Sequence, residues 1–161
     1  MSSDRHARRF FLAGLLALAG CGFVPVYQEN SDLRGAFVFE SDPSVLGYHI
    51  SARLEERLGR TVVPQYLVKV TADSSERAAA ITAEGDTARL NIVGAARWVM
   101  FDLSNDRQID NGQVEAFTSY SATGSTVATQ TTRDDARERL ATILADMITT
   151  QVLARASELP R

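Results

Sequence analysis

The chain has 161 residues, of which 45% are apolar and 23% are charged, and its formal net charge at pH 7 is −3. This length suits one domain with a sizeable core. The negative charge argues against nonspecific binding of nucleic acid, because a phosphate backbone selects an excess of Lys and Arg. One cysteine excludes an internal disulfide, and two histidines are too few for a typical zinc site.

The first 20 residues have the features of a bacterial lipoprotein signal. Three arginines give a basic start, and an apolar stretch follows at 10–18. Such a stretch fits the about 7–15 residues of a secretory signal core and falls short of the about 20 that span a bilayer. The string LAGC ending at Cys21 fits a lipobox, in which the cysteine is diacylated before cleavage. We therefore predict a mature protein that begins at a lipidated Cys21.

Two alternatives concern the leader. The first is an ordinary secretory leader with a buried, unmodified cysteine. The second concerns the route, because Arg8-Arg9 resembles a twin-arginine signal as well as the basic start of a general secretory signal. Gly22 stands where an aspartate would be the familiar retention signal for the inner membrane. Stable anchoring needs more than one acyl chain, so we expect a triacylated protein, palmitate included, on the periplasmic face of the outer membrane.

The predicted organisation is a signal peptide over 1–20, a lipidated tether over 21–31 and a single domain over 32–161. The apolar run AFVF within 33–40 predicts a strand. A helix follows, with Asp42 as N-cap, Pro43 at the first helical position and Gly59 at the end. Its apolar face repeats at four-residue intervals, at Leu46, Ile50, Leu54 and Leu58.

Strand-like segments occupy the middle of the chain. They are predicted at 66–71, 78–83, 88–103 and 113–120. Polar residues 73–77 predict a turn, Gly94 predicts a bulge or bend, and Asn105 to Gly112 predicts a hairpin connection.

A second helix is predicted from about Arg133 to Ser157, after an approximate capping box from Thr132 to Asp135. Its apolar stripe consists of Ala136, Leu140, Ile143, Leu144, Met147, Ile148 and Val152. The order of elements predicts an α+β fold, with a mostly antiparallel sheet of about four to five strands and two helices packed on one face.

The sequence lacks the spacing of common catalytic sites. His49 is the only histidine after the leader, and no nucleophile-elbow or P-loop pattern occurs. We therefore expect no enzymatic activity, no metal site and no cofactor. One segment, 121–129, is rich in hydroxyls and free of charge. It is either a plain connector that caps backbone groups or a contact for a partner through Ser121, Thr123 and Ser125.

Four motifs, taken in order with the lipobox, resemble the LptE family of lipopolysaccharide-assembly lipoproteins in its alphaproteobacterial form. They are CGFVPVY at 21–27, LEERLG at 54–59, YSATGS at 120–125 and RDDARERL at 133–140. The resemblance implies a non-enzymatic plug inside the LptD β-barrel, which assists assembly of that barrel and binds lipopolysaccharide.

Residues that could bind lipopolysaccharide are sought among cations, because lipid A phosphates select grouped guanidinium and ammonium groups. Lys69, Arg89 and Arg97 stand in strands otherwise short of charge. The alternative is that they form the polar face of an amphipathic sheet. Two other functions stay open: an auxiliary lipoprotein of an envelope ABC-type lipid transport system, and a periplasmic hydrolase, which the missing base disfavours.

Overall fold

A computed structural model describes residues 33–81, 87–122 and 125–158, all within the compact unit Asp32–Arg161. The leader, the tether, Cys21 and Thr123 therefore lie outside the described residues. The elements are β1 (Phe37–Ser41), α3 (Val45–Leu58), β2 (Tyr66–Ile81), β3 (Thr87–Asp102), β4 (Arg107–Ser121) and α4 (Thr126–Ser157).

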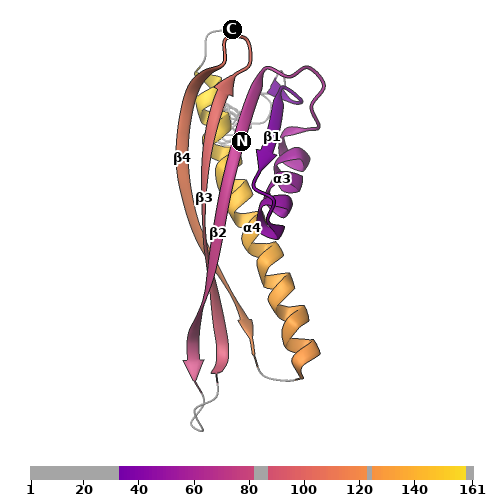
Figure 1. The fold of residues 1–161 in the computed structure, drawn as a ribbon, viewed down its shortest axis with the longest axis vertical. Coiled ribbons are helices and arrows are strands. Elements are labelled where there is room, and N and C mark those ends of the chain that lie inside the picture. The colour runs from indigo at the N-terminus through magenta and orange to yellow at the C-terminus, as the bar shows by residue number, and fades with distance from the viewer. Residues whose placement is uncertain (1–32, 82–86, 123–124, 159–161) are drawn as a thin grey trace, which may run out of the picture. The chain divides into compact units, whose positions relative to one another are not determined.

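The strands form one sheet in the order β1-β2-β3-β4. β1 is parallel to β2, and the other two pairs are antiparallel. Both helices lie on one face of the sheet, and α3 covers only the upper part, next to β1 (Figure 1). The predicted α+β fold with a mostly antiparallel sheet and two helices is confirmed, with four strands in the described part of the chain.

β2 is one continuous strand of 16 residues, so the predicted turn at 73–77 is wrong. Asp73 pairs with Ala95 and Arg77 pairs with Asn91, with no break between them. The polar residues stay extended because β3 offers a backbone partner at every position. Their side chains then alternate between the two faces of the sheet.

The predicted bulge at Gly94 is also absent. The register runs continuously through 90–97 against both neighbouring strands, and Gly94 lies on the helix-covered face with Ile92 and Ala96. A Cβ at Gly94 would come within 2.8 Å of Leu140 Cδ2 in α4. The glycine thus permits close packing of the helix on the sheet instead of bending the strand.

The hairpin connection between β3 and β4 is shorter than predicted. It spans 103–106, while Asn111 and Gly112 belong to β4. Asp106 adopts a left-handed conformation, with φ of 54°, which Asp tolerates better than most residues. Hydrogen bonds from Ser104 and Asn105 to Asp102 tighten the turn and hold the pKa of that carboxyl below its usual value.

α3 begins two residues later than predicted, so neither Asp42 as N-cap nor Pro43 as first helical residue is correct. Its N-cap is Ser44, whose hydroxyl accepts from the Gly47 amide at 2.9 Å. Asp42 instead accepts from the Ala72 amide in β2 at 2.9 Å. Burial opposes ionisation of Asp42, but hydrogen bonds from Ser44 and Ala72 outweigh it and lower the pKa. Gly59 ends the helix with φ of 87°, so the predicted end is confirmed.

α4 begins at Thr126, seven residues before the predicted Arg133. Its N-cap is Ser125, whose hydroxyl accepts from the Ala128 amide at 3.3 Å. The threonines of the first turns do not break the helix, because their hydroxyls donate to carbonyls one turn earlier, as Thr131 does to Val127.

The buried face of α4 repeats every four residues, at Ala136, Leu140, Leu144, Ile148 and Val152. Ile143 and Met147 are exposed, so their predicted place in the core is wrong. A second buried row, at Ala141, Ala145, Thr149 and Leu153, takes their place. α4 contacts both the sheet and α3. Its buried face is therefore wide enough to pack against two neighbouring elements.

The two helices are also joined by a bidentate ion pair. Arg53 Nε and Nη2 donate to the two carboxylate oxygens of Asp146 at 3.1 and 3.2 Å. This pair and a contact with Glu56 raise the pKa of Arg53. The pairing fixes the register of α3 along α4.

Candidate interaction surfaces

Among the residues that the structure describes, no group of three His, Cys, Asp or Glu residues could hold a metal ion. Within the same ranges, no helix combines the length and apolar character needed to cross a membrane.

The three predicted cations all lie on the outer face of the sheet, away from the helices. Lys69 pairs with Val99 and Arg97 pairs with Thr71, so Lys69 and Arg97 are diagonal neighbours. Arg89 lies eight residues further along β3, about 26 Å away at the usual rise of a strand. The structure therefore brings Lys69 and Arg97 together and leaves Arg89 apart.

Lys69 and Arg97 are both engaged locally. Lys69 Nζ lies 3.4 Å from a Glu40 carboxylate oxygen and 5.8 Å from the centre of the Phe101 ring. Arg97 Nε donates to the side-chain oxygen of Gln113 at 3.2 Å. The upper outer face is thus a mixed-charge surface rather than a cationic one.

Arg89 has a different cationic neighbour, which the sequence analysis missed. Arg77 pairs with Asn91, so it is diagonal to Arg89 on the outer face. Both side chains are exposed, and neither forms an ion pair with a carboxylate of the described residues. The predicted turn at 73–77 contains Arg77, and a turn gives no strand register that would place Arg77 beside Arg89. We call Arg77 and Arg89 the lower arginine pair.

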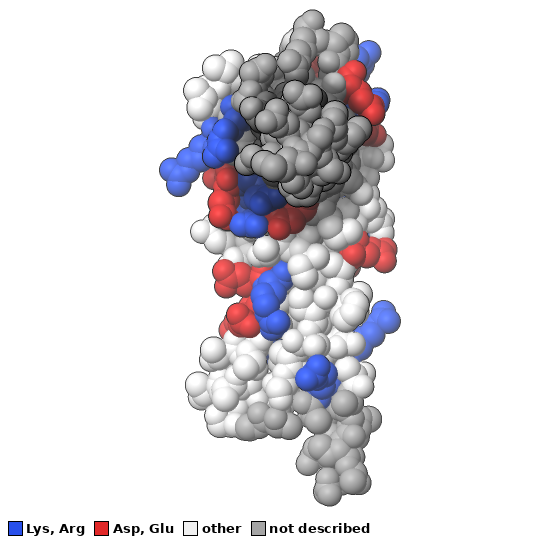
Figure 2. All heavy atoms as spheres, turned by 180° about the vertical axis from the view of Figure 1, so that it is seen from behind, with Lys and Arg blue, Asp and Glu red and all other residues white. Residues whose placement is uncertain are grey.

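Charge is also unevenly distributed on the helix face. In Figure 2 the acidic side chains stop short of the lower end, where isolated basic side chains stand on otherwise uncharged surface. On the inner face Glu76 lies between two cations of α4, one of which also pairs with Asp134. Arg137 Nη2 lies 3.0 Å and Arg133 Nε 3.3 Å from Glu76 Oε1.

Tyr120 completes this cluster around Glu76. Its hydroxyl donates to Glu76 Oε2 at 2.8 Å and accepts from Arg133 Nε at 3.0 Å. The hydrogen bond that Arg133 donates to Tyr120 and the charge of Glu76 raise the pKa of Arg133. The cluster joins β2, β4 and α4 where α3 no longer covers the sheet, and its residues are too far apart in sequence for any local pattern to reveal it.

The hydroxyl-rich segment 121–129 is only partly a connection between β4 and α4, because its two ends belong to those elements. Ser121 is the last residue of β4, and its carbonyl accepts from the Thr132 hydroxyl at 3.3 Å. Ser125 caps α4, and 126–129 belong to that helix. The hydroxyl of Ser125 therefore caps a helix, and Ser121 is an exposed residue at the lower end of the sheet.

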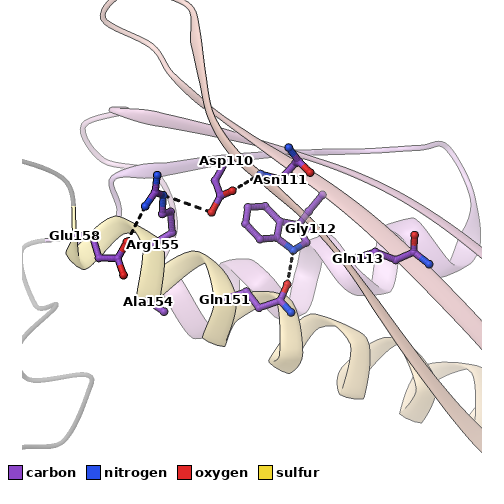
Figure 3. A pocket seen from close by; sticks show the side chains of 9 residues that line it. Asp110, Asn111, Gly112, Gln113, Gln151, Ala154, Arg155 and Glu158 are labelled. Carbon is purple, nitrogen blue, oxygen red and sulfur yellow. Dashed lines mark hydrogen bonds and ion pairs between the residues drawn. The ribbon is translucent and has the colours of Figure 1, made fainter.

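A shallow hollow lies between the upper end of α4 and β4 (Figure 3). Trp98 Nε1 donates to the Gln151 side-chain oxygen at 2.7 Å. Arg155 forms ion pairs with Glu158 at 2.7 Å and Asp110 at 3.5 Å. The charged groups of the hollow are paired with one another. The hollow is therefore a weak candidate for a ligand-binding site.

The outer face also exposes one large aromatic side chain. Phe117 is 66% exposed and lies in a row with Val93 and Ser75 across three strands. No helix of the described chain covers this face (Figure 1). Within this row Val93 and Phe117 form a small apolar patch between the upper mixed-charge surface and the lower arginine pair.

No family model matches the sequence, and no curated protein matches it. The fold, however, is similar to several solved structures. A candidate lipoprotein from Caulobacter crescentus CB15 has a TM-score of 0.69 and 16% identity, with 84% of this chain and 100% of that chain covered. Rare lipoprotein B from Shewanella oneidensis has a TM-score of 0.58 and 10% identity, with 74% and 95% covered.

A third similar structure is a minor lipoprotein from Acinetobacter baumannii. Its TM-score is 0.54 at 16% identity, and 76% of this chain and 93% of that chain are covered. At these identities the likeness establishes a shared fold. It extends over nearly the whole length of each of the three similar chains.

Proposed function

We propose that the protein is an outer-membrane lipoprotein, anchored through Cys21, that acts without catalysis as a plug and assembly factor for an LptD-like β-barrel in lipopolysaccharide transport. The observation that carries the proposal is the joint occurrence of a lipobox and a fold that matches rare lipoprotein B over 95% of that chain. The fold likeness does not depend on the sequence motifs that first suggested the LptE family.

The dimensions of the elements support a plug. β2 and β3 have 16 residues each and α4 has 32, so these elements are each about 50 Å long at the usual rises of strand and helix. They run alongside one another (Figure 1). A slender stack of this kind can enter the lumen of a large barrel without rearranging.

The lower end of the stack supports a contact with lipopolysaccharide. There the lower arginine pair stands exposed, without described acidic partners. Two guanidinium groups on neighbouring strands can bind the phosphates of lipid A as charge-assisted hydrogen-bond donors. Lys69 and Arg97, which are engaged by Glu40 and Gln113, are weaker candidates than the sequence suggested.

The partner is tested by photo-crosslinking in cells. A photoreactive residue at Ser121, Thr123 or Ser125 is expected to give an adduct with one large outer-membrane β-barrel protein. A matched control at Thr150, on an exposed position of α4, is expected to give less of it. Adducts only with an inner-membrane permease would contradict the proposal and favour a role in ABC-type lipid transport.

The anchor is tested separately with labelled palmitate. Wild-type protein is expected to incorporate the label and Cys21→Ser to lose it. Equal incorporation in the two proteins would contradict lipidation of Cys21.

A further inference from the structure

The upper end of the domain exposes three apolar side chains on two connections. Val62 is 80% exposed and Val63 is 63% exposed, both between α3 and β2, and Leu103 in the β3–β4 turn is 41% exposed. Isolated exposed apolar residues are ordinary. Three of them at one end, on connections that meet, form a distinct surface, which we call the apolar tip.

The apolar tip is held in place by backbone hydrogen bonds. The amides of Val62 and Val63 both donate to the Gly35 carbonyl, at 2.9 and 3.4 Å. The Leu103 amide donates to the Gln65 carbonyl at 2.9 Å. The side chains of the tip therefore project from a fixed frame and cannot turn inward without breaking these bonds.

The chain enters the domain at this same end. Leu33 is buried, and the Gly35 amide donates to the Leu58 carbonyl at 2.9 Å. Only residues 22–32 separate Leu33 from Cys21 in the sequence, and a segment of that length spans at most about 40 Å. If Cys21 is acylated, the anchor joins the domain at the end that carries the apolar tip, and this segment is short enough to hold that end close to the bilayer.

Two basic residues flank the apolar tip. Arg34 and Arg60 are exposed, and neither forms an ion pair with a carboxylate of the described residues. Asp102 and Asp106 also lie at this end, and the hydrogen bonds that Asp102 accepts from the Ser104 amide and the Asn105 side chain hold its carboxylate against its own turn while keeping it charged. Apolar side chains beside unpaired cations suit a membrane surface, where acyl chains lie beneath anionic headgroups.

We propose that the apolar tip, with Arg34 and Arg60, inserts shallowly into the lipid leaflet that holds the acylated cysteine. The partner is a lipid surface, and in the lipidated protein that has not yet entered a barrel the contact directs the long strands away from the bilayer interface. This inference rests on the proposed lipidation of Cys21 and concerns the anchored protein before it is bound by a barrel.

Single-cysteine labelling tests the contact in the full lipidated protein. Because acylation occupies the only native cysteine, Val62→Cys supplies one free thiol for an environment-sensitive fluorophore. Val127→Cys is the matched control, since Val127 is an equally exposed valine, 77%, at the start of α4 and the opposite end of the stack. Both variants are placed in vesicles of phosphatidylethanolamine and phosphatidylglycerol that carry a lipid-bound quencher.

The label at 62 is expected to shift to the blue on vesicle binding and to be quenched at least threefold more than the label at 127. Equal quenching at both positions in protein that floats with the vesicles would overturn the contact while leaving the anchor intact. Failure to float would contradict the lipidation itself. A blue shift at 62 that needs no vesicles and grows with protein concentration would assign the tip to a second copy and overturn the proposal.

A substitution provides an independent measurement. With the label at Leu103→Cys, the Val62→Asp/Val63→Asp double variant is expected to lose most of the vesicle-dependent blue shift, whereas Val127→Asp should leave it unchanged. Far-UV circular dichroism checks the fold of each variant. A full shift in the folded double variant would show that the valines do not enter the lipid.

Discussion

The two halves of the sheet are stabilised in different ways. In the half next to β1, both helices cover the inner face, and large side chains such as Phe37, Ile50 and Met100 are fully buried. In the half around Gly94 only α4 covers the sheet. We call them the two-helix half and the one-helix half.

The one-helix half is stabilised by the close approach of α4 to the sheet and by polar contacts between β2 and α4. Gly94 and the buried Ala96 and Ala136 let α4 approach the sheet, and Glu76 with its cations ties β2 to the helix. Burial of large apolar side chains is the main stabilising term in folding, so most of the stability should reside in the two-helix half. The lower end of the one-helix half is then free to present functional groups.

The largest effect is expected from a charge on the buried face of α4. Leu144 is fully buried, so Leu144→Asp should lower the free energy of unfolding by several kcal/mol, because a carboxylate loses its hydration there. Met147→Asp, on the exposed side of the same helix, should change it little. Thermal unfolding followed by circular dichroism measures both, and similar losses in the two variants would contradict the assigned helix face.

A smaller effect is expected from a methyl group in the one-helix half. Gly94→Ala places a Cβ within 2.8 Å of Leu140, which should cost about 1–3 kcal/mol through overpacking. Combining it with Leu140→Ala should cost less than the sum of the single variants, because the clash is removed. A double-mutant cycle from urea unfolding measures this coupling, and strict additivity would mean that the two residues do not meet.

Asp42 allows a test by pH at the junction between β1 and α3. Its pKa is lowered in the folded state, so its charge contributes stability above the ordinary carboxyl pKa of about 3.9 and loses it as the pH falls through the folded pKa. Asp42→Asn should therefore be less stable than wild type at pH 7, by up to about 1 kcal/mol. Urea unfolding at pH 7 and pH 3 should show this difference shrinking at the lower pH, and a constant difference would contradict the assignment.

Substitution of the cations on the outer face is expected to have the smallest effect on stability. It is also the most informative test of function. Arg77→Gln/Arg89→Gln should weaken binding of purified lipopolysaccharide and flatten its salt dependence, while changing stability by less than about 1 kcal/mol. Lys69→Gln/Arg97→Gln is the matched control and should bind nearly as wild type. Equal affinity and equal salt dependence in all three folded proteins would exclude the lower arginine pair as the binding site.

The sequence alone determined the class of fold and several local features. The four-residue repeat through Ile50, Leu54 and Leu58 predicted a helix with the correct buried face, and Gly59 predicted its end, because helical periodicity and the left-handed cap are encoded within a few residues. The order of apolar segments predicted a mostly antiparallel sheet. The lipobox at Cys21 is likewise a local pattern, and it stays a prediction.

Only the tertiary structure decided how far each element extends and which residues meet. Local composition made 73–77 a turn and 126–132 a loop, because polar side chains compete for the backbone when no partner strand or helical neighbour is considered. Pairing with β3 kept the first segment extended, and capping by Ser125 started the second as helix. The same strand register placed Arg77 beside Arg89, since a contact between distant residues depends on register, which no short stretch of sequence contains.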